Sequence, residues 1–161
     1  MEVEIPPADG STEAAQEGFL VAFEALAQAV RRARGAAPQD LPDRLTLSQY
    51  SLLTPLAGGG AARISRLAGE AGIAPSTASR ILDALERRDI VRRAASPEDR
   101  RGVVVSLTDA GREVLGRQDA WMRARRIAFF EELPVAEQLV VSDLLIRLAD
   151  LIDELSAGPA E

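Results

Sequence analysis

Residues 64–107 read ISRLAGEAGIAPSTASRILDALERRDIVRRAASPEDRRGVVVSL, and this stretch decides the fold. It contains two short helical patterns joined by a tight turn, and a hairpin pattern follows them. This order is typical of a winged helix-turn-helix, a fold that many proteins use to bind DNA. The first functional hypothesis is therefore DNA binding.

The first helical pattern covers residues 64–71. Its apolar residues repeat at i, i+3, i+4 and i+7, which places them on one helical face. They are Ile64, Leu67, Ala68 and Ala71. Gly72 suits the left-handed conformation that ends many helices, and Ile73 adds an apolar side chain to the turn. We therefore expect a short helix that packs on the core and ends at Gly72.

The second helical pattern begins near Pro75, because proline suits the first position of a helix, and runs to about Arg88. Its expected buried face consists of Ala78, Ile81, Leu82 and Leu85. The opposite face carries short polar side chains first and arginine later: Ser76, Thr77, Ser79, Arg80, Asp83, Ala84 and Arg87. Short side chains permit close approach to a major groove, and Arg80 can reach a base edge or a phosphate. Taken alone, the pattern also fits an ordinary amphipathic helix.

Residues 89–94 and 102–107 predict the two strands of a hairpin. In the second run, Val103, Val105 and Leu107 alternate with Val104 and Ser106, as in a half-buried strand. The connection 95–101 is rich in turn residues and carries Arg100 and Arg101. Arginines at such a tip can enter the narrow, negative minor groove of DNA. The hairpin therefore fits the wing of the motif.

These motifs resemble the MarR family of bacterial transcription regulators. Residues 99–111, DRRGVVVSLTDAG, are similar to its wing and the start of the next helix. Residues 75–80 (PSTASR) and 85–88 (LERR) resemble its recognition helix, and residues 45–50 (LTLSQY) resemble the start of its second helix. The likeness is close over about residues 45–115. It implies a mainly α fold with a small β-hairpin wing, in which a winged helix-turn-helix joins a helical dimerisation layer.

Pattern and resemblance together give a set of expected DNA-binding residues. Arg63 and Arg66 can touch backbone phosphates, and the resemblance assigns Asp99 to brace Arg101 by a charge-assisted bond. Asp99 as a plain turn residue is the alternative. The full set is Arg63, Arg66, Ser76, Thr77, Ser79, Arg80, Arg87, Asp99, Arg100 and Arg101. A dimer would place two recognition helices about one turn of DNA apart, which predicts a pseudo-palindromic operator on double-stranded DNA.

The charge of the chain is unevenly distributed. The net charge of −6 at first argues against a nucleic-acid partner. Residues 61–102, however, contain nine arginines and six acidic residues, which gives +3 there and leaves −9 for the rest. A basic lobe on an acidic body still provides a surface for phosphates.

The composition excludes several kinds of chemistry. The chain has no cysteine and no histidine, so disulfides, thiolate switches, Ser-His-Asp catalysis and most zinc sites are excluded. Its carboxylates fall on helix faces without a convergent partner. We therefore expect no enzyme, no catalytic or metal site and no cofactor. A winged helix used only for protein contacts is the remaining alternative, and the Arg100–Arg101 tip argues against it.

Helical segments precede and follow the winged helix-turn-helix in the sequence. Residues 1–11 and 157–161 are expected to be tails, residues 12–45 and 109–156 the helical dimerisation region, and residues 46–108 the DNA-binding lobe. An apolar stripe on the helix at 12–34 consists of Phe19, Phe23, Leu26 and Val30. A final helix over about 135–155 carries Val141, Leu145, Leu148, Ile152 and Leu155 at steps of four and three. Such spacing suits packing against helices of a second chain. A homodimer is expected, with an intramolecular bundle as the alternative.

Two further helix starts are marked by threonine. Thr46 and Gln49 form a Thr-x-x-Gln capping box, and Thr108 begins the long helix after the wing. In the helix at 46, we expect Leu47, Tyr50, Leu53 and Ala57 to point inward. Pro55 is expected to kink this helix or end it early, and three glycines at 58–60 to form a turn.

The resemblance also implies regulation by a small effector, often aromatic or phenolic, bound between the dimerisation layer and the DNA-binding lobe. Such a ligand shifts populations between DNA-competent and incompetent states. Tyr50, Trp121 and Arg125 are the candidate effector-binding residues, with core or surface roles as the alternative. No apolar run approaches the ~20 residues of a membrane span, and the first residues do not fit a signal peptide. We therefore expect a cytoplasmic regulator, a repressor, that an effector releases from DNA.

Overall fold

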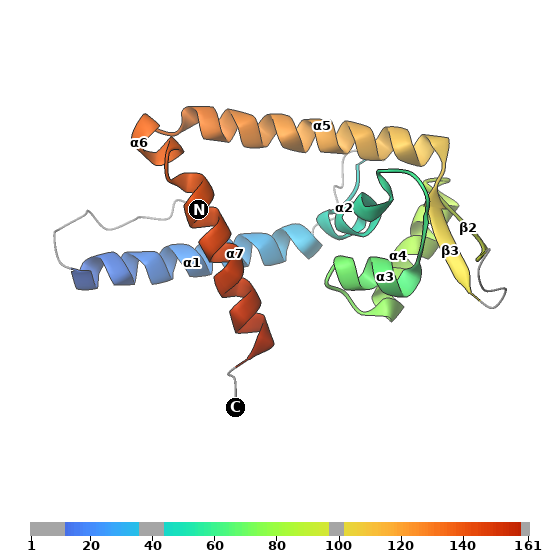
Figure 1. The fold of residues 1–161 in the computed structure, drawn as a ribbon, viewed down its shortest axis with the longest axis horizontal. Helices are drawn as coiled ribbons and strands as arrows, with labels where there is room; N and C mark the ends of the chain where they lie inside the picture. Colours follow the sequence, from blue (N-terminus) through green and yellow to red (C-terminus); the bar gives the residue numbers. More distant parts are fainter. Residues whose placement is uncertain (1–11, 36–43, 97–101, 159–161) are drawn as a thin grey trace. The chain divides into compact units, whose positions relative to one another are not determined.

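The computed structural model describes residues 12–35, 44–96 and 102–158 (Figure 1). The chain divides into two compact units, residues 1–118 and 119–161, and each is considered separately. The first unit contains α1 (Thr12–Gly35), α2 (Leu47–Leu53), a 3₁₀ helix η1 (Thr54–Leu56), β1 (Ala61–Arg63), α3 (Ile64–Glu70), α4 (Pro75–Arg87), β2 (Val91–Ala95), β3 (Val103–Leu107) and the start of α5 (Asp109–Glu132). The second contains the rest of α5, α6 (Val135–Gln138) and α7 (Val141–Ala157).

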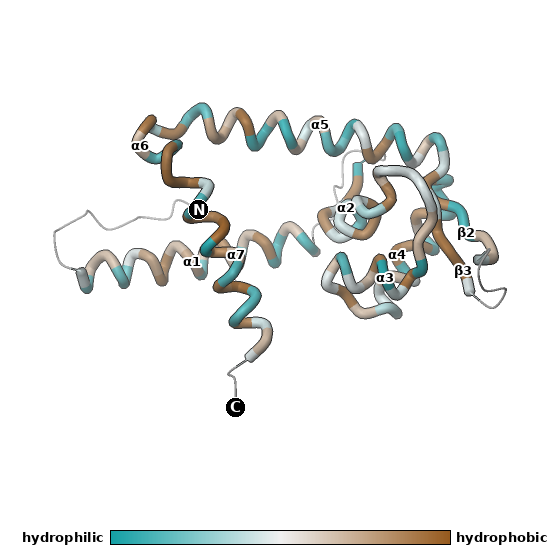
Figure 2. The backbone as a smooth tube through the Cα atoms, viewed as in Figure 1, coloured by the Kyte–Doolittle hydropathy of each residue, from teal (hydrophilic) through white to brown (hydrophobic). Residues whose placement is uncertain are grey.

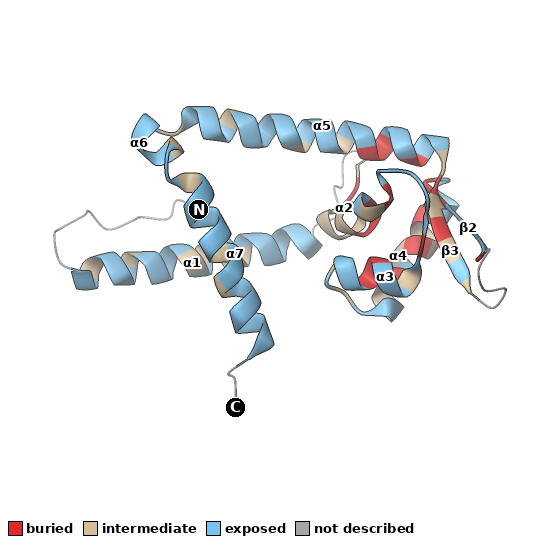
Figure 3. Ribbon diagram, in the orientation of Figure 1, coloured by how far each residue is buried: buried red, intermediate tan, exposed pale blue. Residues whose placement is uncertain are grey.

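The buried core lies in the winged helix-turn-helix of the first unit. Figure 3 shows buried residues gathered in α2, α3, α4, the sheet and the start of α5. The largest fully buried side chains are Leu52, Leu53, Leu67, Leu82, Leu85, Val91 and Val105. The predicted apolar faces of α3 and α4 are therefore confirmed, with Ile64, Ala71, Ile73 and Ile81 half-buried at the edge of this core.

The turn between α3 and α4 follows the prediction. Gly72 has φ of +63°, a left-handed conformation that costs glycine little. The amide of Ile73 then donates to the carbonyl of Ala68 at 3.0 Å, which directs the Ile73 side chain to the core. Pro75 is the first residue of α4. These contacts set the angle at which α4 leaves α3.

The wing belongs to a three-stranded antiparallel sheet in the order β1-β3-β2. The predicted hairpin is confirmed, although β2 begins at Val91 because Asp89, with φ of +55°, lies in the preceding turn. The strand β1 was not expected. Its three residues carry no strand signal, and they pair because β3 offers an open edge, with Ala62 opposite Val105. Val103 is exposed, contrary to expectation, because it pairs with Ala95 at the end of the sheet.

The helix at residue 46 begins as predicted and ends early. Thr46 Oγ1 accepts from the Gln49 amide at 3.1 Å, and Gln49 Oε1 accepts from the Thr46 amide at 3.0 Å, so the capping box is confirmed. The α-helix stops at Leu53 and Pro55 lies in η1. Because a 3₁₀ helix repeats every three residues, Leu56 follows Leu53 into the core and Ala57 is exposed. The expected inward position of Ala57 is wrong, and Leu47 and Tyr50 are half-buried.

The start of α5 is fastened to the turn that precedes β2. Thr108 is the residue before the helix, and its Oγ1 accepts from the Gly111 amide at 2.9 Å. The Thr108 amide donates to the Ile90 carbonyl at 3.1 Å. Thr108 thus caps α5 and joins it to the winged helix-turn-helix.

In the second unit, the single helix predicted over 135–155 is wrong. The structure has α6 and α7, separated at Leu139 and Val140. The Gln138 side chain donates to the carbonyls of Phe130 at 3.1 Å and Leu133 at 2.9 Å, which turns α6 back onto the end of α5. The β-branched pair Val140 and Val141 then marks the restart.

The helices α1 and α7 leave much of their apolar surface exposed. All of α7 is described, and none of its residues is buried. Exposed large apolar residues on the two helices are Phe19, Leu20, Val21, Leu26, Val30, Leu144, Leu145, Ile146, Ile152 and Leu155. Figure 2 shows hydrophobic residues interleaved with hydrophilic ones along α7. The predicted amphipathic pattern is present on α7, and large apolar residues on it are exposed.

Within the described ranges, no helix has the length and apolarity to cross a membrane. The same residues contain no group of three or more acidic side chains that could hold a metal ion. The expected tail at 1–11 and the last three residues, 159–161, lie outside the described residues.

Candidate nucleic-acid interface

The helix α4 separates a buried face from an exposed one. Ala78, Leu82 and Leu85 are fully buried. On the other side Ser76, Arg80 and Arg87 are exposed, and Thr77 and Ser79 are half-buried at the margin. The structure thus brings all five predicted major-groove residues onto the outer surface of one helix.

The N-terminus of α4 has no side-chain cap. Ala74 precedes the helix and has no side chain that could accept a hydrogen bond, and Pro75 occupies the first position. The amides of the first turn have no partner within a helix, so an uncapped start directs N–H donors outward. Such a start can bind an anionic oxygen, including a DNA phosphate.

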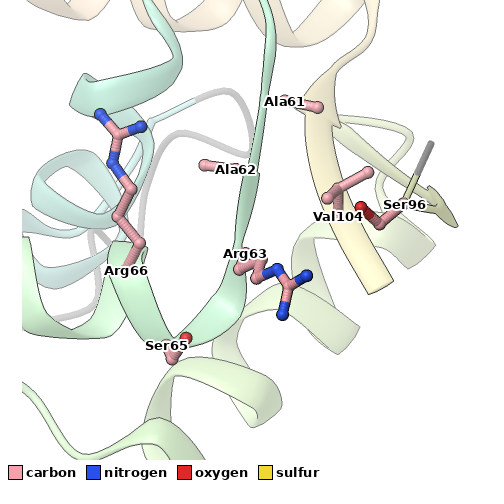
Figure 4. A pocket seen from close by; sticks show the side chains of 7 residues that line it. All are labelled: Ala61, Ala62, Arg63, Ser65, Arg66, Ser96 and Val104. Atoms are coloured by element: carbon pink, nitrogen blue, oxygen red, sulfur yellow. The ribbon is translucent and has the colours of Figure 1, made fainter. Parts of the chain in front are cut away.

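Arg63 and Arg66 lie beside α4, at the junction of β1 and α3. Both are exposed, and they line a pocket of about 450 Å³ with Ala61, Ala62, Ser65, Ser96 and Val104 (Figure 4). Their guanidinium groups point away from each other, so they do not converge on one ligand (Figure 4). Arg66 Nε lies 2.7 Å from Glu70 Oε1. An exposed pair of this kind contributes at most about 1 kcal/mol, so a phosphate can compete for Arg66.

Arg93 in β2 is a functional candidate that the sequence pattern did not reveal. Its guanidinium lies 2.6 Å from Asp83 Oδ1 and 3.0 Å from Glu86 Oε2, both on α4. Asp83, which periodicity placed on the polar face, therefore forms an ion pair with Arg93 of the same chain. Opposite charges on α4 and on the following strand were the available signal, but helical periodicity does not report contacts between two elements.

The wing tip residues Asp99, Arg100 and Arg101 lie outside the described residues. The base of the wing is described. The amide of Ser96 donates to the carbonyl of Gly102 at 2.7 Å, which brings the two ends of the connection together. The proposed minor-groove role of the tip stays a prediction.

The three candidate effector residues belong to different units. Tyr50 is half-buried in α2 and packs against the core of the first unit. Trp121 and Arg125 are exposed on the part of α5 that belongs to the second unit. They are four residues apart, so they share one helix face. A common effector site for all three residues stays a prediction.

Comparison with known proteins gives one consistent family. The model of the MarR family matches residues 45–103. The HTH-type transcriptional repressor MdtR of Bacillus subtilis is 31% identical over 109 residues, 65% of this chain and 68% of that protein. An uncharacterised HTH-type transcriptional regulator of Mycobacterium leprae is 35% identical over 111 residues, 69% of this chain and 75% of that protein.

Solved structures agree with this likeness. A MarR family transcription regulator superposes with a TM-score of 0.75 at 20% identity, over 90% of this chain and 97% of that one. The transcriptional repressor CouR, bound to a 23-mer DNA duplex, gives a TM-score of 0.60 at 26% identity, over 96% and 100%. BpsR of Bordetella bronchiseptica, whose DNA binding is regulated by 6-hydroxynicotinic acid, gives 0.61 at 26% identity, over 80% and 92%.

Proposed function

This chain belongs to the MarR family of transcription regulators, and on that premise we propose that it is a dimeric repressor. In this proposal it binds a pseudo-palindromic operator through α4 and the wing, and a small effector releases it. Two similar proteins, MdtR and CouR, are described as transcriptional repressors, which supports the direction of regulation.

The observation that carries the proposal is the outer face of α4. Ser76, Arg80 and Arg87 are exposed there, opposite a fully buried apolar face, and the helix start is uncapped. We assign Ser76, Thr77, Ser79, Arg80 and Arg87 to the major groove. Arg63 and Arg66 bind phosphates beside it, and Arg100 and Arg101, braced by Asp99, bind the minor groove.

The exposed apolar surface of α1 and α7 supports a second copy of the chain as partner. Monomeric proteins rarely expose contiguous apolar patches of large area. The residues on α7 follow the steps of four and three that suit helix packing between chains. A twofold dimer built there would present two α4 helices to successive major grooves on one side of the DNA.

The effector proposal concerns Trp121 and Arg125 most directly. An exposed indole can stack on an aromatic ring, and a guanidinium four residues along the same helix face can pair with a carboxylate. A hydroxylated aromatic acid has both groups. The 6-hydroxynicotinic acid that regulates BpsR is a ligand of this class.

The test is fluorescence anisotropy with labelled DNA from upstream of the gene for this chain, at several salt concentrations. We expect tight, salt-dependent binding that Arg80→Ala weakens by roughly fivefold to a hundredfold. The matched control is Arg117→Ala, which removes the same charge from an exposed position on α5 paired with Glu113. Binding to the upstream DNA that is no tighter than binding to random DNA, together with the same result for a panel of genomic fragments, would overturn the proposal.

A further inference from the structure

We propose that Arg93 is a positioning residue that holds the β2–β3 hairpin at a set distance from α4, so that both elements bind DNA together. This inference rests on the function proposed above, because it concerns the same interface. It gives Arg93 a role inside the protein in place of a contact with DNA.

Arg93 makes four hydrogen bonds to α4, the helix that precedes its strand. Its side chain donates to Asp83 Oδ1 at 2.6 Å, to Glu86 Oε2 at 3.0 Å and to the carbonyl of Ser79 at 3.3 Å. Its main-chain amide donates to Glu86 Oε1 at 3.2 Å. These bonds reach two turns of α4 and therefore fix both the distance and the orientation of the strand relative to the helix.

The environment of Arg93 makes these bonds stronger than those of a surface ion pair. Its side chain is 24% exposed, whereas that of Arg66, in an ordinary pair on α3, is 65% exposed. Partial burial reduces screening by water, and a guanidinium shared between two carboxylates forms charge-assisted bonds to both. The Nε of Arg93 is buried without a partner among the described residues. That unpaired donor is costly, which fits a side chain held in place by its other bonds.

The charges of Asp83, Glu86 and Arg93 explain why acidic side chains occur on α4, the helix proposed to bind DNA. Without Arg93, Asp83 and Glu86 would place two negative charges beside Arg80 and Arg87, where phosphates must approach. With Arg93, one charge is neutralised, and both carboxylates are engaged by the hairpin. In this proposal, Asp83 and Glu86 therefore hold the hairpin through Arg93 and do not contact DNA bases.

The preceding residue of β2 provides a matched comparison. Arg92 is exposed, and its Nε donates to Ser106 Oγ on β3 at 3.2 Å. That bond lies within the sheet and does not reach α4. Arg92→Ala removes the same charge from the same strand as Arg93→Ala and leaves the connection to α4 intact.

The experiment is a double-mutant cycle with Arg101, measured as operator affinity by fluorescence anisotropy. In the wild-type background we expect Arg101→Ala to weaken binding by roughly tenfold, as for loss of one specific DNA contact. In the Arg93→Ala background we expect the same change to weaken binding by less than about twofold, because a misplaced hairpin no longer delivers the tip. In the Arg92→Ala background the effect of Arg101→Ala should keep its full size.

A second variant, Asp83→Asn with Glu86→Gln, separates positioning from charge and replaces Arg93→Ala if that protein does not fold. It makes α4 less negative by two charges, so electrostatics alone predict tighter DNA binding. Positioning predicts the reverse: weaker binding, and an effect of Arg101→Ala reduced to about twofold or less.

The outcomes distinguish this inference from the proposed function. Wild-type protein that does not prefer its operator would refute the function itself. If the wild type binds and Arg101→Ala weakens it equally in all backgrounds, the function stands and the positioning role of Arg93 is refuted. If Arg101→Ala has no effect on the wild type, the hairpin has no DNA contact to position, and the inference fails with it.

Discussion

The carbonyl oxygen of Ile90 occupies the space that a side chain on Gly111 would need. A Cβ atom built on Gly111 would lie 1.9 Å from that oxygen and 2.8 Å from its carbon. Both are backbone atoms and cannot move aside without shifting the turn that precedes β2. The first turn of α5 can therefore approach the winged helix-turn-helix only because residue 111 is glycine.

Gly111→Ala should lower the free energy of unfolding by about 2 kcal/mol or more, since overpacking against backbone is not relieved by a change of rotamer. Urea unfolding, followed by circular dichroism at one fixed protein concentration, measures the change. The matched control is Gly116→Ala on the same helix, where nothing lies within 4 Å of the built Cβ. The free energy of unfolding of that variant should rise by up to about 1 kcal/mol. Equal stability of the two variants would contradict the close approach.

Thr108→Val should destabilise the same junction by about 1 kcal/mol or more. The substitution keeps the shape of the side chain and removes the hydroxyl, which accepts from the Gly111 amide and donates to the carbonyls of Asp89 and Ile90. Thr108→Ser, which keeps the hydroxyl, is the control and should stay within about 0.5 kcal/mol of wild type. If valine and serine at this position give the same midpoint in urea, the cap does not contribute.

Periodicity predicted α3, α4, the turn at Gly72 and the hairpin because each of these depends on residues close together in the sequence. The strand β1 pairs with a strand far away in the sequence, and the bonds of Arg93 join two different elements. The spacing of residues within one element does not predict such contacts. The position of α6 has the same origin, since the Gln138 side chain of α6 donates to the Phe130 carbonyl of α5. The outer residues of α4 were predicted from their period, whereas the partner of Asp83 was not.

Leu145→Glu should convert the proposed dimer to a monomer. Leu145 is 57% exposed on α7, within the apolar stripe, and a carboxylate there would be buried without a partner in a dimer. Size-exclusion chromatography with light scattering measures the mass. The control, Arg147→Glu, places an acid on the polar side of the same helix and should leave the dimer intact. A wild-type protein of monomer mass, or a Leu145→Glu protein of dimer mass, would contradict an interface built on this stripe.

Arg31→Ala should raise the pKa of Glu24. The side-chain hydrogen bond from Arg31, at 2.7 Å, is the largest cause that lowers the pKa of this carboxyl below 4.5, and the bond from Gln28 adds to it. A carboxyl with a lowered pKa in the folded protein stabilises it above the unfolded pKa, and that contribution is lost as the pH falls through the folded pKa. Carbon-detected NMR titration of Glu24 measures the shift. Arg32→Ala is the control, and an unchanged Glu24 titration in Arg31→Ala would show that the pair does not persist in solution.

Arg125→Ala should weaken binding of hydroxylated aromatic acids without weakening operator binding. Trp121 is the single tryptophan of the chain, so a change in tryptophan fluorescence reports the surroundings of this residue alone. We expect a hydroxybenzoate to quench this fluorescence and to reduce operator affinity over the same concentration range, as coupled binding requires. Arg125→Ala should raise the concentration needed for both effects by roughly tenfold, the loss of one charge-assisted pair. Arg123→Ala removes the same charge from an exposed position on the same helix and should change neither. Quenching that leaves operator affinity unchanged would mean that Trp121 binds such acids without regulating DNA binding, and the effector site would then lie elsewhere.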